Sequence, residues 1–263
     1  MIIVKIGGGK DININGIIQD LAAIKEPFFI VHGANALRDQ LAKDLKKPKK
    51  IITSVSGYSS VFSDVSAIDV MMMAYAGLRN KRIVELCHQH GINAIGLSGL
   101  DGKLIEGERN KGIRIKEDGK LKIVRDLSGK PKRINIRLLQ LLIENGFTPV
   151  LSVPIIDEQN TAINSENDDI VSLLQMSVQA DVIIQLIEAP GFLDNPDDPD
   201  SVIAAISRQE LSRREEQVSG RMKRKILALR KLFDTGAHRV IIADGRLQHP
   251  VQSALAGKGT IIQ

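Results

Sequence analysis

Short apolar segments alternate along the chain with segments in which apolar residues recur every three or four positions. The apolar segments predict buried strands at residues 1–6, 28–31, 93–98, 148–156, 181–187, 239–243 and 260–262. The periodic segments predict helices at residues 14–25, 64–89, 138–144, 170–178, 210–218, 220–233 and 251–256. Strands that alternate with helices build a mainly parallel sheet covered on both faces. The expected fold class is therefore α/β, a three-layer α/β/α sandwich.

Two segments depart from this alternation. Residues 104–124 form short alternating stretches rich in lysine and arginine, with a turn signal at residues 117–119, and they predict hairpins that stand off the main sheet. Residues 51–60 are rich in β-branched and hydroxyl side chains and predict a turn-like segment. Ser63 and Asp64 follow it as the expected cap of the long helix.

The positive charge is concentrated in one of these segments. Between residues 103 and 133, eleven lysines and arginines stand against five acidic residues, an excess that is larger than the +5 net charge of the whole chain. Such a patch predicts an acidic partner, either a small acidic protein or an acidic metabolite. Nucleic acid is the alternative, but aromatic residues make up only 3% of the chain and tryptophan is absent, so stacking surfaces are scarce.

Composition excludes several classes of protein. With 43% hydrophobic and 25% charged residues over 263 positions, the chain is typical of a globular protein with a sizeable core. No apolar run reaches the roughly 18 residues that span a bilayer, and a signal-peptide pattern is lacking, so we expect a cytoplasmic protein. The single cysteine, Cys87, lies in an apolar helical pattern and is expected to be a core residue.

The first candidate for chemistry is the junction between the first strand and its turn. Lys5 lies on the predicted buried strand, where a cation is costly unless it meets an anion. Gly7, Gly8 and Gly9 follow, and glycines let the backbone approach a ligand and present amide groups to phosphate oxygens. The pattern predicts a phosphate cradle. An edge strand with a solvent-reaching lysine and a flexible turn is an equal alternative from these residues alone.

Other common catalytic patterns are missing from the sequence. There is no P-loop, no strand-initiated dinucleotide fingerprint and no nucleophile elbow. His88 and His90 are two apart and cannot share a helical face, and neither HExxH nor paired CxxC occurs, so we expect no protein-held metal. Glycine-rich strand ends, lysines near both ends of the chain and an Asn/Asp cluster remain, and phosphoryl transfer requires little more.

An ordered set of short motifs extends this hypothesis over nearly the whole chain. KIGGGK, VHG, GLSGLDG, the 164–168 segment, IEAPGFL, GRMKRK and ADGR occur in the order found in the amino acid kinase family, which the chain resembles. It is most similar to the acetylglutamate kinase branch, in particular to kinases that act on aminoadipate or glutamate attached to an acidic amino-group carrier protein. The basic stretch LIEGERNKGIRIK is similar to the hairpin with which those kinases grip their protein-bound substrate.

The resemblance implies ATP-dependent phosphorylation of a side-chain carboxylate, giving an acyl phosphate in lysine or arginine biosynthesis. The alternative acceptor is free N-acetyl-L-glutamate. The implied cofactors are ATP and Mg²⁺, with Mg²⁺ held mainly by ATP. One kinase domain would cover residues 1–263, with an N-lobe (1–178) for substrate binding and dimerisation and a C-lobe (179–263) for the nucleotide. The apolar helix at residues 71–86 makes a homodimer plausible, and no membrane or nucleic-acid partner is expected.

The resemblance also assigns roles to individual residues. Lys5 and Lys225 would stabilise the transferred phosphoryl group, and Asp168 would hold both lysines. The implied substrate-binding residues are Gly33, Ala34, Val61 and Asn164. The implied nucleotide-binding residues are Gly8, Gly9, Glu188, Gly191, Phe192, Gly220 and Met222, and the implied carrier-protein contacts are Arg109, Lys111, Arg114 and Lys116.

Several positions depart from the family pattern. Ala34 and Asn35 stand where glycines are usual, and Val61 stands where related enzymes carry an arginine that grips the substrate carboxylate. Glu188 replaces a frequent aspartate, and Arg221 replaces a glycine. These departures leave open the identity of the acceptor, and Ala34 and Asn35 also leave open a non-catalytic binding protein on the same fold.

Overall fold

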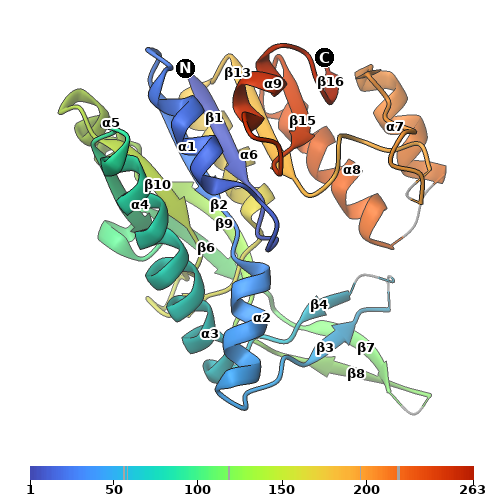
Figure 1. The fold of residues 1–263 in the computed structure, drawn as a ribbon. Helices are drawn as coiled ribbons and strands as arrows, with labels where there is room; N and C mark the ends of the chain where they lie inside the picture. The colour runs from blue at the N-terminus through green and yellow to red at the C-terminus, as the bar shows by residue number, and fades with distance from the viewer. Residues whose placement is uncertain (56, 58, 118, 196, 218–219) are drawn as a thin grey trace.

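The structure is a computed structural model that describes residues 1–263 apart from 56, 58, 118, 196, 218 and 219; of residues 59, 217 and 220–225 it describes the backbone only. An eight-stranded sheet crosses the molecule in the order β14, β16, β15, β13, β1, β2, β10, β5 (Figure 1). Only the pairing of β15 with β16 is antiparallel among the described strands of this sheet. The predicted mainly parallel sheet is confirmed. The strands are β1 (Ile2–Ile6), β2 (Phe28–His32), β5 (Ala94–Ser98), β10 (Thr148–Ser152), β13 (Val182–Ile187), β14 (Ala205–Ile206), β15 (Val240–Asp244) and β16 (Thr260–Ile262).

Helices cover both faces of this sheet, so the three-layer arrangement is confirmed as well. One apolar core lies under α1 (Ile14–Ala22), α4 (Asn80–Gln89) and α9 (Pro250–Leu255). The other core lies under α5 (Ile136–Glu144), α6 (Asn167–Val178) and α8 (Gly220–Asp234). Two further helices, α2 (Asn35–Asp44) and α7 (Arg208–Gln217), lie toward the periphery.

Alternation along the central strands decides which side chains reach the site. Ile2, Val4 and Ile6 of β1 belong to the core under α1, whereas Ile3 belongs to the core under α6. Successive side chains of a strand point to opposite faces, so Lys5 projects on the α6 side. The predicted buried strand therefore directs the Lys5 ammonium group toward helix α6.

The basic segment forms structures outside the main sheet, as predicted. A four-stranded sheet has the order β12 (Ala162–Ile163), β11 (Ile155–Ile156), β6 (Ile105–Arg109) and β9 (Gly129–Ile134). The β7 (Ile113–Glu117) and β8 (Lys120–Val124) strands form a hairpin, and β3 (Ile51–Thr53) and β4 (Ser59–Val61) form another. Both hairpins extend away from the main sheet in Figure 1. The turn-like prediction for residues 51–60 was therefore wrong in part.

Two other boundaries differ from the prediction. The expected strand at residues 148–156 is interrupted at Pro154, which has no amide group for a strand ladder, and its end joins the four-stranded sheet as β11. The expected long helix starts as predicted, since the Asp64 carboxylate accepts from Ala67 N–H at 2.9 Å. However, α3 (Val65–Met71) and α4 are joined by a π-helical segment, η1 (Met72–Arg79). A 3₁₀ turn, η2 (Asp101–Lys103), follows β5.

No helix in the described part of the chain has both the length and the apolar character needed to cross a membrane. Cys87 is buried in the core under α1 and α4, as predicted.

Candidate active site

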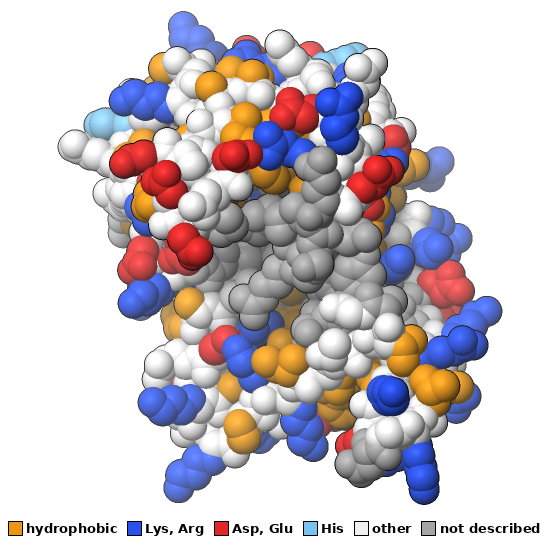
Figure 2. Space-filling model, turned by 90° about the vertical axis from the view of Figure 1, so that its right-hand side faces the viewer, with side chains coloured by type: hydrophobic (Ala, Val, Ile, Leu, Met, Phe, Trp, Pro, Cys, Tyr) orange, Lys and Arg blue, Asp and Glu red, His pale blue; other side chains and the backbone are white. Residues whose placement is uncertain are grey.

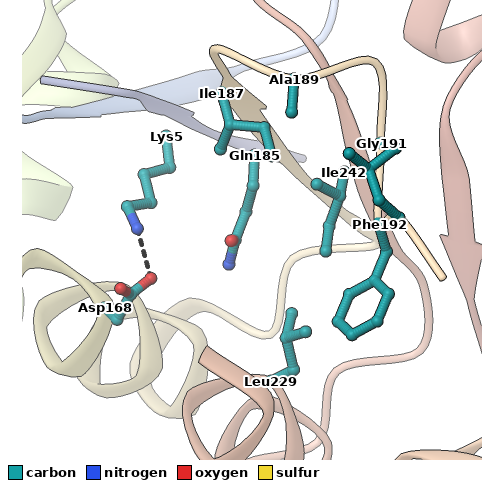
Figure 3. A pocket seen from close by; sticks show the side chains of 10 residues that line it. Lys5, Asp168, Gln185, Ile187, Ala189, Gly191, Phe192, Leu229 and Ile242 are labelled. Atoms are coloured by element: carbon teal, nitrogen blue, oxygen red, sulfur yellow. Dashed lines mark hydrogen bonds and ion pairs between the residues drawn. The ribbon is translucent and has the colours of Figure 1, made fainter. Parts of the chain in front are cut away.

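An ion pair between Lys5 and Asp168 lies at the centre of the site. Lys5 leaves the carboxyl-terminal half of β1, and its Nζ contacts Oδ1 of Asp168 in the first turn of α6 (Figure 3). The two side chains are 16% and 32% exposed, so the pair lies partly out of water. Helix α6 starts at Asn167, earlier than the predicted residue 170, and this places the Asp168 carboxylate where a helix N-terminus stabilises negative charge. Two of the three predicted catalytic residues are thus in contact.

The third predicted catalytic residue, Lys225, lies on α8, but its side chain is outside the described residues, as is that of Met222; the predicted Gly220 is the first residue of this helix. Helix α8 nevertheless reaches α6, because Lys231 Nζ contacts Asp169 Oδ1 at 3.0 Å. Sequence analysis missed this second pair. The adjacent carboxylates of Asp168 and Asp169, together with the basic α8 sequence, were the available signal.

A first cavity, of about 220 Å³, opens between the ends of the central strands and α8. Its polar lining consists of Lys5, Asp168 and Gln185 among the described residues. The rest of the lining is apolar or backbone, namely Ile187, Ala189, Gly191, Phe192, Leu193, Leu229 and Ile242. Gly191 and Phe192, predicted as nucleotide-binding residues, therefore lie in the same cavity as the ion pair. The Phe192 backbone is fixed there, since its N–H donates to Thr260 Oγ1 at 2.7 Å.

A second cavity, of about 570 Å³, lies on the other side of Asp168, which lines both. Its walls come from the two hairpins, from β9, from the segment that opens α6 and from α8, and they include the predicted residues Val61 and Asn164. Lys111, Arg114, Lys130 and Lys231 supply the positive charge of its lining. Asn164 is oriented by its neighbours, because its Nδ2 donates to Ser63 Oγ at 3.0 Å. The two cavities thus share Asp168 of the ion pair.

Two glycine turns lie beside the ion pair, at the ends of β1 and β2. A Cβ atom on Gly8 would lie 2.6 Å from Asn35 N, and one on Gly33 would lie 2.9 Å from Gly8 N. Side chains at these positions would therefore force the turns apart. The amide groups of Gly8, Gly9 and Lys10 donate to no acceptor among the described residues. Consecutive free amides of this kind form an anion-binding concavity.

Charged side chains surround the first glycine turn. Glu188, at the end of β13, accepts from Asp11 N–H at 2.7 Å. Arg79, the last residue of η1, donates from Nη2 to Gly9 O at 3.3 Å, while its buried Nε has no partner among the described residues. Burial lowers the pKa of Arg79, and the negative charge of Glu188 acts in the opposite direction. Arg79 was missed by sequence analysis, because a basic residue in a long helix is normally solvated.

The second glycine turn is held by the same helix. Tyr75 Oη donates to Asn35 Oδ1, and burial raises the pKa of Tyr75. Gly33 and Ala34, predicted to bind substrate, are buried between the turns and do not line the second cavity. His32 lies beneath them, and burial lowers its pKa to about 3, so the ring is neutral at pH 7.

The four predicted carrier contacts occupy different environments. The Arg109 guanidinium binds the fully buried Asp157 carboxylate, with Nη2–Oδ2 at 2.6 Å and Nε–Oδ2 at 2.9 Å, so its charge is already neutralised within the protein. Lys111 and Arg114 line the second cavity. Lys116 lies further out on β7 and is exposed. In the part of the chain that the structure describes, none of these last three makes an ion pair.

Acidic side chains offer little to a metal ion here. Within the described residues, no group of three or more His, Cys, Asp or Glu side chains converges on one point. Asp168 and Asp169 each face a lysine.

This arrangement suits the transfer of an anionic group between two ligands. A cation held by a carboxylate, free backbone amides and two cavities that meet at one point can orient two reactants and stabilise charge that develops between them. No nucleophilic serine or cysteine is needed for such a step.

Comparison with known proteins agrees with this chemistry. Residues 1–244 match the model of the amino acid kinase family. The chain is 37% identical to the [LysW]-aminoadipate kinase of Thermus thermophilus over the full length of both proteins. It is 35% identical to the [LysW]-aminoadipate kinase of Deinococcus radiodurans, covering 100% of this chain and 91% of that one. Among solved structures, smu.665 from Streptococcus mutans has the same fold, with a TM-score of 0.75 at 20% identity, over 100% of this chain and 98% of that one. The chain is a phosphotransferase that belongs to the amino acid kinase family.

Proposed function

We propose that this enzyme transfers the γ-phosphoryl group of ATP to the side-chain carboxylate of 2-aminoadipate or glutamate attached to an acidic amino-group carrier protein. The observation that carries the proposal is that Asp168 lines both cavities while it binds Lys5. Two ligands placed in the two cavities would face each other across this ion pair. The two [LysW]-aminoadipate kinases are similar over the full length of this chain, which supports the acceptor.

In this proposal the first cavity takes the nucleotide. Its apolar walls suit a base, and the free amides of Gly8 and Gly9 suit phosphate oxygens. An oxygen of the acceptor carboxylate attacks the γ-phosphorus, the bond from that phosphorus to the bridging oxygen breaks, and ADP leaves with the bond electrons. Lys5 stabilises the transferring group, and Lys225 is proposed to do the same from α8. Mg²⁺ would be held mainly by the phosphates of ATP.

The second cavity takes the acceptor. A carrier protein cannot enter the molecule, so its attached amino acid must extend into the cavity while the carrier itself rests outside. Lys111, just before the β7–β8 hairpin, and Arg114, on β7, line this cavity, and Lys116 lies further out on β7. Lys and Arg side chains are scattered, with hydrophobic ones and uncharged polar ones between them, over the lower part of Figure 2. An acidic carrier fits this surface.

The acceptor is tested by mixing the enzyme with ATP, Mg²⁺ and carrier-linked aminoadipate or glutamate, and trapping the acyl phosphate with hydroxylamine. We expect hydroxamate from at least one carrier-linked substrate. Product from free N-acetyl-L-glutamate alone would instead assign the enzyme to acetylglutamate kinases. Val61 disfavours that outcome, because this enzyme has no arginine at that position to bind the carboxylate of a free acceptor. ATP binding without turnover on any acceptor would indicate a non-catalytic protein.

Apolar side chains are exposed along the helical segment formed by α3 and η1. Val65, Met73 and Leu78 leave 68%, 46% and 44% of their surface exposed along α3 and η1, which supports a homodimer through this helix. Light scattering coupled to size exclusion tests the dimer, and a monomer at micromolar concentration would contradict it.

We place the enzyme in the cytoplasm, where ATP and biosynthetic carriers meet.

A further inference from the structure

Gln185 is a polar residue of the first cavity that has no role in the steps above. It lies on β13 directly opposite Lys5 of β1 in the parallel register. Its strand neighbour Ile183 belongs to the core under α6, so Gln185, like Lys5, projects from this face. In Figure 3 the Gln185 amide lies between the Lys5–Asp168 pair and the apolar side of the cavity.

The surroundings of Gln185 leave its hydrogen-bonding groups unused. The residue is only 7% exposed, and within the described part of the chain its amide has no hydrogen-bond partner. Its amide opens on the first cavity and is not enclosed in the core, so two donors and an acceptor are available to a bound group. A polar side chain that has no partner among the described residues and is directed into a mainly apolar cavity indicates a ligand.

Gln175 shows how a structural glutamine differs. It is fully buried, its Oε1 accepts from Ala180 N–H at 3.1 Å, and its Nε2 donates to Ala180 O at 3.3 Å. This side chain completes the backbone hydrogen bonding at the end of α6. Gln175 thus has a structural role, whereas the amide of Gln185 is available to a ligand.

The position of Gln185 favours one part of the nucleotide over the others. A base would pack on the apolar side, against Phe192 and Leu229, whereas Gln185 faces the side where Lys5 provides positive charge. An oxygen atom that lies close to both Lys5 Nζ and the Gln185 amide is most stable when it is anionic. We propose that Gln185 donates a hydrogen bond from Nε2 to a phosphate oxygen of the nucleotide bound in the first cavity, beside Lys5. This inference rests on the proposed function, because it takes ATP as the ligand.

The experiment compares Gln185→Leu with the matched control Gln175→Leu. Binding of ATP and of adenosine is measured by calorimetry without an acceptor, and the melting temperature is measured without ligand. Loss of a hydrogen bond to a charged group should weaken ATP binding of Gln185→Leu by about 10- to 100-fold, with adenosine binding unchanged. Its ligand-free melting temperature should stay level, since the Gln185 amide makes no hydrogen bond within the described part of the chain. That of Gln175→Leu should fall by several degrees, at ~2–4 °C for each kcal/mol lost.

Each other outcome has a definite meaning. ATP affinity within about threefold of the unchanged enzyme would overturn the inference. An equal loss with adenosine would place the amide on the nucleoside and would also overturn it. A ligand-free melting temperature that falls as far as that of Gln175→Leu would assign Gln185 a structural role. Because no acceptor is present, a wrong acceptor assignment does not affect the result, whereas an unchanged enzyme that bound no ATP would overturn both proposals.

Discussion

The two cavities that meet at Asp168 are built from different kinds of structure. Strand ends and buried apolar side chains such as Phe192 and Ile242 enclose the first cavity, and both side chains are at most 7% exposed. Loops, two hairpins and exposed cations such as Lys111 enclose the second. A wall made of sheet core holds a small ligand in fixed geometry, whereas exposed cations attract a large acidic partner over a distance. The two halves of the site should therefore respond differently to substitution and to salt.

The largest expected effect comes from the residue that both halves share through Asp168. Lys5→Met removes the cation from the junction of the cavities, and we expect kcat to fall by about 10³-fold, the upper range for loss of one preorganised group. Lys25→Met, an exposed lysine that lines neither cavity, is the control and should stay within a few-fold. Steady-state kinetics measure both variants. Comparable activity of the two variants would remove Lys5 from the reaction.

Asp168→Asn should be the next most severe change. The amide keeps the shape of the side chain but leaves Lys5 without its counter-charge, so we expect a loss of about 10²-fold in kcat. Asp169→Asn breaks the neighbouring pair with Lys231 and is expected to cost less than 10-fold, because that pair joins α6 to α8 without contacting Lys5. A larger loss of kcat in Asp169→Asn than in Asp168→Asn would show that the reaction depends on the Lys231–Asp169 pair and not on the Lys5–Asp168 pair.

Reversing the charge of the hairpin should distinguish most clearly between the functions of the two cavities. For Arg114→Glu/Lys116→Glu we expect the KM for the carrier-linked substrate to rise by about 10- to 100-fold, with the KM for ATP unchanged. The KM of the unchanged enzyme should rise with salt, and that of the variant should rise less. Lys25→Glu/Lys43→Glu, exposed elsewhere, makes the same charge change and should have little effect. A shift of the ATP KM in the hairpin variant would contradict the separation.

The smallest expected effect is a pH dependence of the free energy of unfolding that comes from His32, which lies beneath the glycine turns. The folded-state pKa of His32 is about 3, below its usual 6.5, so the unfolded chain binds the extra proton between these values. Stability is therefore complete above pH 6.5 and falls as the pH is lowered through this window, by about 1.4 kcal/mol between pH 7.5 and 5.5. Denaturant melts of the enzyme and of His32→Gln at both pH values measure it. An equal pH dependence in the two proteins would rule out His32 as the source.

Hydrophobic patterning was sufficient for the core of the fold but not for every part of the site. The alternation in β1 placed Lys5 on a buried strand, and the contact with Asp168 shows why a cation is tolerated there. Residues 181–187 were interpreted as an almost fully apolar strand, and that description passed over Gln185, the one uncharged polar residue inside it. A polar residue interrupting an apolar strand was the available signal.

Other features could not be predicted, because they depend on contacts between distant segments. A π-helical segment has the same apolar residues as an α-helix, so η1 left no distinct pattern in the sequence. The pairing of Arg109 with Asp157 joins residues 48 positions apart, so no pattern in the sequence indicated that Arg109, predicted as a carrier contact, would bind a carboxylate of its own chain. Hairpins β3–β4 and β7–β8 become walls of one cavity only once the chain has folded.

The π-helical segment also limits how this enzyme can change in length. Tyr75 reaches one glycine turn and Arg79 the other, and Asn80 immediately afterwards donates to His32 Nε2 and to Val150 O. A π-turn contains about one residue more than an α-helical turn, so deleting a single residue would restore ordinary winding and rotate Arg79 and Asn80 away from these partners. Insertions and deletions in this stretch should consequently be poorly tolerated.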